Sequence, residues 1–474
     1  MSEQGLEGIE DRTVSDQVEH IRREFGKEGA AAELGGADGT VVGPGGIDIG
    51  VKVSGGQLGY MYAEGQILVR EPYLKRVHEI LGRPMPTDQE RGDWGEEDPK
   101  PVQPLIADLA VLNFKKQEDG RYPSVPELLD RIDRVIGPGY ATPNHVLTVC
   151  GQVGPCPATE PEEVYDGIEP YPSVGSAEVG DGISIYIADT GLLHYPHDDL
   201  DPPMPDPAHP HERQVVTNKG VPNAWLAGVK GTLDRRQDMT GLQDIRPYEG
   251  HGTFVAGVAR CAAPKADIYV DDVFKIAGST LETHLARRLN SALAHGYDLY
   301  HLSVAAPTRK DLPLISFEGW LRRLRQYKGA ACVVAAGNSG LRLPTWPAAF
   351  PEVVSVGALA ADWRSRALFS NYGPWVDVYA PGRDLINAFA YGTYKCYTYP
   401  YKPEPRKFYG MAKWSGTSFS TPLVTGLIAA RMWRTGENGL EAAAALLAEA
   451  RSAAIPGVGP ILLPYHHDPA WPVR

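Results

Sequence analysis

The sequence is poor in cysteine and contains no long apolar run. Only five of its 474 residues are cysteines. Cys261 and Cys332 lie inside apolar runs, as buried thiols do in a reducing compartment. No stretch of about 18 apolar residues is present, which excludes a helix that crosses a bilayer. Residues 1–7 are acidic and lack the apolar segment of a secretory signal. We therefore expect a cytoplasmic protein that makes no membrane contact.

The sequence also has a shortage of positive charge. It contains 46 Lys and Arg against 59 Asp and Glu, for a formal net charge of −13. A surface of this sign repels phosphate backbones, so we expect no nucleic-acid partner. The hydrophobic content of 43% is ordinary for a globular protein, and the length exceeds that of one typical domain. Two or more folded units are expected.

The first third of the chain predicts a flexible segment followed by a small α+β domain. Residues 1–55 begin with a possible short helix and become Gly-rich, so we expect them to be largely flexible. Residues 56–148 alternate strand and helix patterns. The predicted elements are a strand at 66–70, a helix at 73–81, a strand at 107–114, a helix at 124–136 with Ser124 and Glu127 as a capping box, and a strand at 143–147.

The rest of the chain predicts a larger α/β domain. Residues 149–180 are rich in Pro, Gly and acidic residues and are expected to be a linker. From 181 to 455, apolar strands alternate with helices, which predicts a parallel sheet with helices on both faces. A long polar insertion occupies 193–249, and residues 456–474 form a C-terminal tail.

Four polar residues follow or precede apolar segments of this domain. Asp189 ends the strand at 183–188, His251 opens a helix after a glycine, Asn338 follows the strand at 331–336, and Ser418 opens another helix. Because the carboxyl ends of parallel strands meet at one edge of a sheet, these four side chains can converge.

The four residue types suit acyl transfer. A serine hydroxyl needs a neighbouring base, and imidazole is a suitable base near neutral pH. A buried carboxylate holds that imidazole in one tautomer, and an Asn amide can donate to a developing oxyanion. Individually, however, each residue also has a purely structural interpretation: Ser418 as a helix cap, His251 as a satisfied core residue, Asp189 as a turn residue and Asn338 in a left-handed conformation.

The motifs around these residues resemble those of the subtilisin-like serine peptidases, or subtilases. They are Asp-Thr-Gly at 189–191, His-Gly-Thr-Phe-Val-Ala-Gly at 251–257, Ala-Ala-Gly-Asn at 335–338 and Gly-Thr-Ser-Phe-Ser-Thr-Pro at 416–422. The order Asp, His, Ser is the one known for subtilisin. The resemblance covers roughly 180–455.

The resemblance implies a fold and a set of roles. The fold is a subtilisin-like parallel-sheet catalytic domain with helices on both faces, preceded by a small ferredoxin-like domain of the propeptide type. Ser418 is implied as nucleophile, His251 as general acid and base, Asp189 as the orienting carboxylate and Asn338 as an oxyanion donor. The implied substrate cleft is lined by Ser303, Val304, Ala305, Ala306 and Gly337.

The chain departs from the family pattern at three places, one of which is the unusual pair Lys413 and Trp414 next to the nucleophile turn. Phe254 stands where the family usually has a second histidine. Val304-Ala305-Ala306 replaces a more Gly-rich cleft wall, and the added methyl groups would narrow the first specificity pocket or lift the peptide. Substrate preference therefore cannot be carried over.

The propeptide resemblance also predicts how the two domains relate. The domain at 56–148 is expected to dock on the catalytic domain, with the chain after Leu147 lying along the cleft as a pseudo-substrate. Self-cleavage is then expected between about 145 and 180. The substrate would be a polypeptide.

Other features remain open. The insertion holds a possible metal-binding group, for which the more economical interpretation is a solvated loop: His194, His197, Asp198, Asp199, His209 and His211. No metal site or organic cofactor is expected, and calcium, which is frequent in the family, has no assigned ligands. Residues 391–409 alternate aromatic and polar side chains, as in a surface hairpin or one that holds substrate by strand addition.

Two other functions compete with a peptidase. One is a catalytically silent subtilase-fold binding module. The other is a sedolisin-type acid peptidase, which would have a Glu in place of His251.

Overall fold

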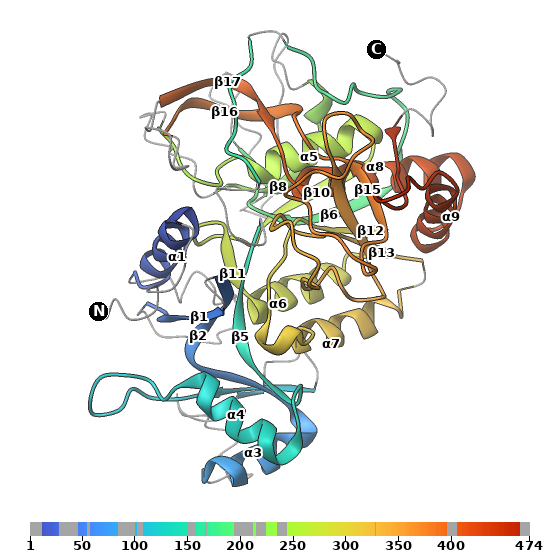
Figure 1. Ribbon diagram of the computed structural model, residues 1–474. Helices are drawn as coiled ribbons and strands as arrows, with labels where there is room; N and C mark the ends of the chain where they lie inside the picture. Colours follow the sequence, from blue (N-terminus) through green and yellow to red (C-terminus); the bar gives the residue numbers. More distant parts are fainter. Residues whose placement is uncertain are drawn as a thin grey trace.

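The computed structural model describes most of the chain, shown in Figure 1. The described residues are 12–27, 46–54, 57–83, 100–101, 108–149, 158–165, 168–193, 212–214, 224–234, 244–327, 329–395 and 405–464. Within them, no helix is long and apolar enough to cross a membrane. Cys261 and Cys332 are buried free cysteines, as expected from the apolar runs around them.

The first domain is built on an antiparallel sheet in the order β11-β5-β2-β4-β3, with β1 paired to β2. Its strands are β1 (Ile49–Ser54), β2 (Gln57–Arg70), β3 (Lys100–Pro101), β4 (Leu109–Asn113) and β5 (Ala141–Thr148), and β11 (Ser279–Leu281) joins from the second domain. Helices α3 (Leu74–Leu81) and α4 (Val125–Ile136) lie together at the lower end of Figure 1. The side chain of Ser124 accepts a hydrogen bond from the Glu127 N–H, as an N-cap does.

The alternation of side chains along β2 places this sheet between two apolar layers. Ile67 and Val69 are fully buried in a cluster with the α3 and α4 side chains. Leu68, which points to the opposite face, is buried with Ala286 and Ile315 of the second domain. The sheet therefore packs against its own helices on one side and against the larger domain on the other.

The second domain contains an eight-stranded sheet in the order β15-β14-β13-β12-β6-β10-β8-β7. Neighbouring strands are parallel except at the β7–β8 edge. The strands are β6 (Ser184–Asp189), β7 (Glu212–Gln214), β8 (Lys230–Thr232), β10 (Asp267–Asp272), β12 (Leu299–Leu302), β13 (Ala331–Ala335), β14 (Val354–Leu359) and β15 (Val378–Pro381).

Helices cover both faces of this sheet, as the alternating pattern predicts. In Figure 1, α5 (His251–Ala262) and α8 (Thr417–Thr435) lie above the sheet, whereas α6 (Glu282–Leu293) and α7 (Ile315–Leu324) lie below it. Helix α9 (Gly439–Ser452) packs on α8. A separate ribbon of β16 (Leu385–Lys395) and β17 (Pro405–Trp414), with β9 (Asp244–Ile245), corresponds to the hairpin expected around 391–409.

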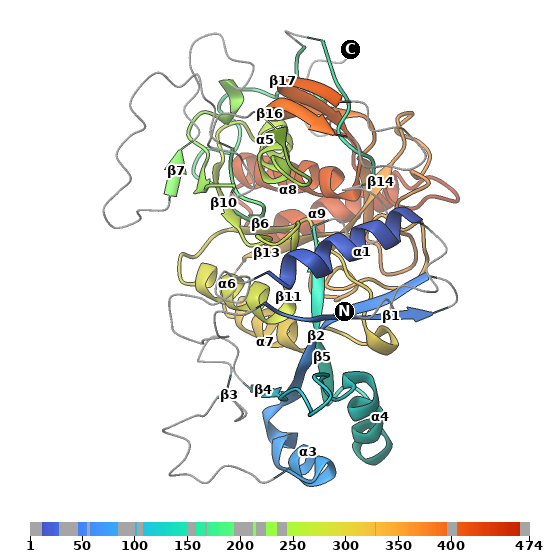
Figure 2. The ribbon, with the colours of Figure 1, turned by 90° about the vertical axis from the view of Figure 1, so that its left-hand side faces the viewer.

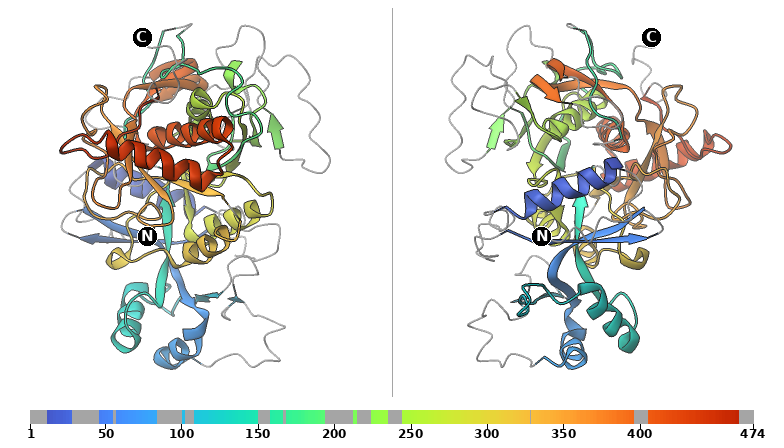
Figure 3. Two further views of the ribbon diagram at one scale, coloured as in Figure 1. Left: turned by 90° about the vertical axis from the view of Figure 1, so that its right-hand side faces the viewer. Right: turned by 60° about the vertical axis from the view of Figure 1, so that its left-hand side comes forward.

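Within residues 1–55, the parts that the structure describes, 12–27 and 46–54, differ from the flexible segment expected there. Residues 12–25 form helix α1 (Arg12–Phe25), and β1 pairs with β2. Val18, Ile21 and Phe25 repeat at helical spacing and are almost completely buried. They pack with Val146 of β5 and with residues of the second domain, and Figure 2 and the right view of Figure 3 show α1 lying across the end of β5. Some partners of α1 lie in residues 47–63 and the others, Val146, Ile276 and Leu281, lie more than a hundred residues away, so the Gly-rich sequence next to α1 did not reveal its packing.

The expected linker at 149–180 is also partly docked on the second domain. Glu162 forms an antiparallel bridge with Lys413, and Tyr171 forms one with Ile386. In the insertion at 193–249, the histidines and aspartates considered as metal ligands lie outside the described residues.

The contact between α5 and α8 leads to the first prediction. A Cβ placed on Gly426 would lie 2.5 Å from the Ala259 carbonyl oxygen and 2.8 Å from the Ala262 Cβ. In an uncrowded helix, Gly→Ala stabilises by about 1 kcal/mol. Here we expect Gly426→Ala to lower the free energy of unfolding by about 1–3 kcal/mol, because the methyl forces the helices apart. Urea unfolding measures this, with Ala444→Gly on the exposed face of α9 as the control for helix propensity alone. A stabilised Gly426→Ala would contradict the close approach.

Candidate active site

Asp189 and His251 form a fully buried pair. Asp189 is the last residue of β6, and His251 is the first residue of α5. The His251 Nδ1 and the Asp189 Oδ1 are 2.7 Å apart, and both side chains are inaccessible to solvent. The same carboxylate oxygen accepts the Thr190 N–H at 2.8 Å. A carboxylate at this distance fixes the orientation and tautomer of the imidazole.

The other face of the His251 ring is held by aromatic side chains. Its centroid lies 5.7 Å from the Trp414 ring in an edge-on arrangement and 5.4 Å from the Phe419 ring. Its Nε2 is buried and has no hydrogen-bond partner among the described residues. With Nδ1 occupied by Asp189, Nε2 is the nitrogen available for proton transfer.

Ser418 lies at the N-terminus of α8 and is buried. It is the second residue of α8, it is 1% exposed, and the next residue, Phe419, touches the His251 ring. The Ser418 Oγ donates a hydrogen bond to the carbonyl oxygen of Val149 at 3.1 Å. The predicted nucleophile is thus in contact with a peptide carbonyl, and its hydrogen bond goes to the oxygen of that carbonyl and not to the His251 Nε2.

The Val149 carbonyl is delivered by an extended strand that runs between two edges of the second domain. Residues Val146, Leu147 and Thr148 pair with β11. The Val149 N–H donates to the Gly278 carbonyl at 3.0 Å, and the Ala305 N–H contacts the Thr148 carbonyl at 3.4 Å. Backbone pairing on both sides holds the strand in one register, so that it ends with a buried Val149 at Ser418.

Asn338 is oriented by the residue that precedes Ser418. Its Oδ1 accepts both the N–H and the hydroxyl of Thr417, each at 2.9 Å. The Thr417 hydroxyl oxygen in turn accepts the Gly337 N–H at 3.1 Å. These bonds occupy the oxygen end of the Asn338 amide and leave its NH₂ end pointing away from Thr417. Such a fixed donor can stabilise negative charge without reorganising.

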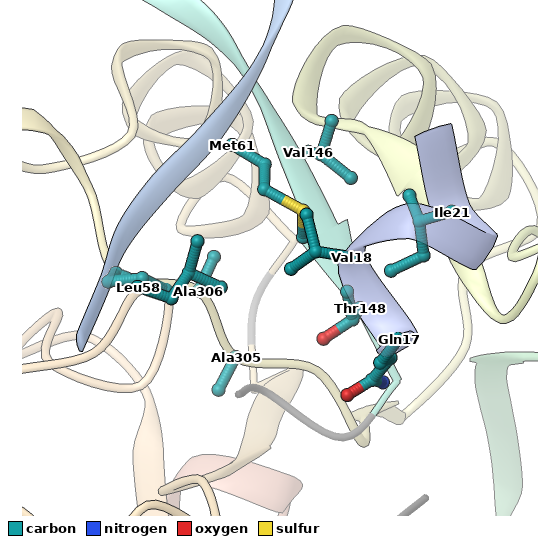
Figure 4. A pocket seen from close by; sticks show the side chains of 10 residues that line it. Gln17, Val18, Ile21, Leu58, Met61, Val146, Thr148, Ala305 and Ala306 are labelled. Atoms are coloured by element: carbon teal, nitrogen blue, oxygen red, sulfur yellow. The ribbon is translucent and has the colours of Figure 1, made fainter. Parts of the chain in front are cut away.

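The predicted cleft wall is buried beneath the strand. Ser303, Val304, Ala305 and Ala306 are all at most 2% exposed. The Ala305 Cβ lies 3.2 Å from where a Cβ on Gly337 would be, so its methyl group closes the space over that glycine. Figure 4 shows Ala305 and Ala306 on one side of a small pocket, with Thr148, Gln17 and Ile21 on the other. The methyl groups of Ala305 and Ala306, which were expected to narrow the cleft, therefore face the part of it in which Val146 and Thr148 lie.

His301 belongs to this region, although the sequence analysis did not single it out. It is fully buried, with Nε2 at 2.8 Å from the Ser303 Oγ and Nδ1 at 3.1 Å from the Thr425 Oγ1. The Ser303 Oγ donates to the Ser418 carbonyl at 3.0 Å. Burial lowers the pKa of His301 to about 3, against the smaller opposing effect of Asp189. An isolated histidine in an apolar strand carries no sequence signal for these contacts, because one of its two partners, Thr425, comes from α8.

The remaining candidates are placed as follows. Phe254 packs against Trp414 and Phe419 and does not enter the polar part of the site. Among the described residues, no group of three or more His, Cys, Asp or Glu side chains could hold a metal ion, so calcium still has no assigned ligands.

Comparisons with known proteins agree on one family. A family model described as "Subtilase family" matches residues 180–450, more than half of the 474-residue chain. Subtilisin Savinase of Lederbergia lenta is 30% identical over 198 residues, which are 40% of this chain and 65% of that protein. The thermophilic serine proteinase of Bacillus sp. (strain AK1) is 31% identical over 208 residues, which are 42% of this chain and 46% of that protein.

The chain therefore spans about half to two thirds of the length of these relatives. Among solved structures, a cold adapted subtilisin-like serine proteinase is 19% identical and superimposes with a TM-score of 0.41, covering 65% of this chain and 95% of that one.

The buried imidazole of His301 predicts a specific dependence of stability on pH. Above its ordinary pKa of 6.5, His301 is neutral in both the folded and the unfolded chain, so it adds no pH dependence. As the pH falls from 6.5 towards 3, the unfolded chain gains a proton that the folded chain does not, and stability is lost by an amount on the order of a few kcal/mol. His301→Asn should flatten this slope in urea unfolding measured between pH 7 and pH 4. Parallel slopes for the two proteins would contradict the neutral burial of His301.

Proposed function

Because the chain belongs to the subtilase family, we propose that it is a serine endopeptidase that hydrolyses peptide bonds through an acyl-enzyme. One observation carries the proposal: the Ser418 hydroxyl contacts a peptide carbonyl at 3.1 Å, and the next residue, Phe419, packs against an imidazole that is paired to a buried carboxylate at 2.7 Å. One aligned relative is named a serine proteinase and another a subtilisin.

In the proposed reaction, Ser418 attacks the carbonyl carbon of the substrate. The hydroxyl proton passes to the His251 Nε2, and the resulting imidazolium is stabilised by Asp189. The carbon–nitrogen bond then breaks, His251 returns the proton to the leaving amine, and an ester to Ser418 remains. Water, deprotonated by His251, hydrolyses this ester and restores the hydroxyl. To attack, the hydroxyl has to turn from the carbonyl oxygen towards Nε2.

The negative charge on the carbonyl oxygen is assigned to two donors. One is the Asn338 NH₂ group, whose amide is fixed through its oxygen by Thr417. The other is the Ser418 N–H at the start of α8, where backbone donors are not used by the helix. Both donors are buried, which strengthens their effect on the transition state.

We assign residues 56–148 as a propeptide-type domain that inhibits the enzyme. Its strand β5 runs into the cleft and presents Val149 to Ser418. Two polar contacts support a stable complex between the domains: the buried His145 Nδ1 lies 2.6 Å from the Glu282 Oε2, and Arg70 forms two bonds with Glu318 at 2.7 and 2.8 Å. Helix α1 adds an apolar cover over Val146.

The proposal includes a cellular setting. The two buried thiols, Cys261 and Cys332, support a reducing compartment such as the cytoplasm. The rival function, a catalytically silent binding module, would show the same fold with a strand resting in an inert cleft. Turnover at Ser418 distinguishes the two.

The bond between Val149 and Cys150 is the predicted site of self-cleavage. Purified full-length protein should convert to two fragments, with a new N-terminus at Cys150, because the Val149 carbonyl already touches the nucleophile. Ser418→Ala should stay intact, whereas Ser452→Ala, at the exposed end of α9, should be cleaved like the wild type. Intact mass and N-terminal sequencing are the measurements. Wild-type and Ser418→Ala proteins of identical mass after long incubation would favour the silent module.

The oxyanion assignment predicts a rate effect at Asn338. Asn338→Leu should slow cleavage by about 10²–10³-fold, as expected for the loss of one buried donor. The effect should fall on kcat rather than on KM in a peptide assay after processing, because the donor acts on charge that develops in the transition state. A variant with unchanged kcat would remove Asn338 from this role.

A further inference from the structure

A short segment of the chain lies along the outer edge of β17, next to the nucleophile. We refer to residues 158–163 as the docked segment. Glu162 exchanges two backbone hydrogen bonds with Lys413, at 2.8 and 3.0 Å, in an antiparallel bridge. The Ala158 N–H donates to the Ser415 carbonyl at 3.2 Å. Ser415 is three residues before Ser418, so this edge begins at the active site.

Side chains add charge and polar contacts to this pairing. The Lys413 Nζ lies 2.6 Å from the Glu162 Oε2, and the Lys407 backbone N–H donates to the Glu163 carboxylate. Arg406 donates to the Pro161 carbonyl at 2.6 Å, and the Trp414 indole donates to the Thr159 carbonyl at 2.7 Å. An acidic segment is thus held by a strand that carries basic residues: Arg406, Lys407 and Lys413.

The direction of the docked segment matches that of a substrate. Strand β17 runs towards Ser418, and the docked segment is antiparallel to it, so from Ala158 to Glu163 it moves away from the nucleophile. A polypeptide in the cleft would place the residues before its cleaved bond where 146–149 lie. The residues after that bond would leave Ser418 in the same direction as the docked segment. The β17 edge is therefore oriented to pair with the part of a substrate that follows the cleaved bond.

We propose that the β17 edge from Arg406 to Ser415 is a docking site for acidic residues that follow the cleaved bond of a polypeptide substrate, and that the docked segment is its internal competitor. The proposal rests on the peptidase function proposed above.

The docked segment is part of the same chain, so it has to leave the β17 edge before a substrate can bind there. A tethered segment binds at an effective concentration in the millimolar range, so an added peptide competes poorly until the segment is weakened. Removing charge from the docked segment should therefore help a substrate, and removing charge from β17 should harm it. If the docked segment were a fixed structural part, both changes would act in the same direction. Opposite effects of these two changes on cleavage would show that the docked segment and the substrate compete for the β17 edge.

The test uses the self-processed full chain and two peptides. Both carry the sequence of residues 146–149 before the cleaved bond, followed by eight residues with either three Glu or three Gln at positions three to seven. We expect kcat/KM to be about tenfold higher for the Glu peptide, with the difference shrinking at high salt because the contacts are half-exposed.

Variants on the two sides of the contact should then diverge. Lys413→Gln should abolish the preference for the Glu peptide. The double variant Glu162→Gln/Glu163→Gln should raise cleavage of the Glu peptide several-fold. Lys395→Gln, an exposed lysine on the neighbouring strand β16, should leave both rates unchanged.

Three results would overturn the proposal. Equal cleavage of the two peptides by the wild type removes the docking site while leaving the peptidase function intact. A loss of activity in both the Lys413 and the Glu162/Glu163 variants assigns the contact to structure alone. Failure to cleave either peptide, together with failure to self-cleave, overturns the proposed peptidase function and the docking site with it.

Discussion

The hydrogen bond between His251 and Asp189 is the constraint around which the second domain is arranged. Burying an unpaired carboxylate costs folding free energy, so the buried Asp189 needs a partner. Asp189 is at the end of β6, and its partner His251 is the first residue of α5, more than 60 residues later in the chain. The bond can form only if β6 and α5 are held in one relative position. That position depends on the close packing of α5 on α8, which also carries Ser418. The positions of His251 and Ser418 therefore depend on how closely α5 and α8 pack in the core.

A second constraint is the shared strand β5. It pairs with β2 in the first domain and with β11, a strand that the second domain contributes to the same sheet, so backbone hydrogen bonds join the two domains. Pairing of this kind is largely independent of side-chain identity, and any extended polypeptide can make it. This explains how an internal strand and an external substrate can use one cleft. It also leaves selectivity to the few places where side chains intervene, such as the methyl group of Ala305 and the charges along β17.

The hairpin β16–β17 lies where the sequence pattern at 391–409 left two interpretations open, a surface hairpin or one that holds substrate by strand addition. Its alternating aromatic and polar residues predicted a hairpin but not its use. Phe408 packs in the core with Phe389, whereas Tyr409 is 56% exposed, as alternation requires. The edge itself is covered by a segment that lies more than 240 residues earlier in the chain. An exposed strand edge would pair with other chains, and coverage by the docked segment protects it from such pairing.

The sequence by itself determined the order of the four motifs, the alternation of strands and helices and, through both, the family. Ser418, His251, Asp189 and Asn338 could be found because each lies next to a strand end or helix start, where local sequence fixes the backbone. Most strands and helices were also placed correctly within a few residues, because their periodicity is a local property. The tertiary structure alone decided the position of α1, the burial of His301 between α8 and the cleft wall, and which residue, Val149, meets Ser418; the family resemblance had implied only that the chain after Leu147 lies along the cleft. The physical reason is that these depend on pairings between segments more than a hundred residues apart, and no local pattern of side chains records which distant surface will bury them.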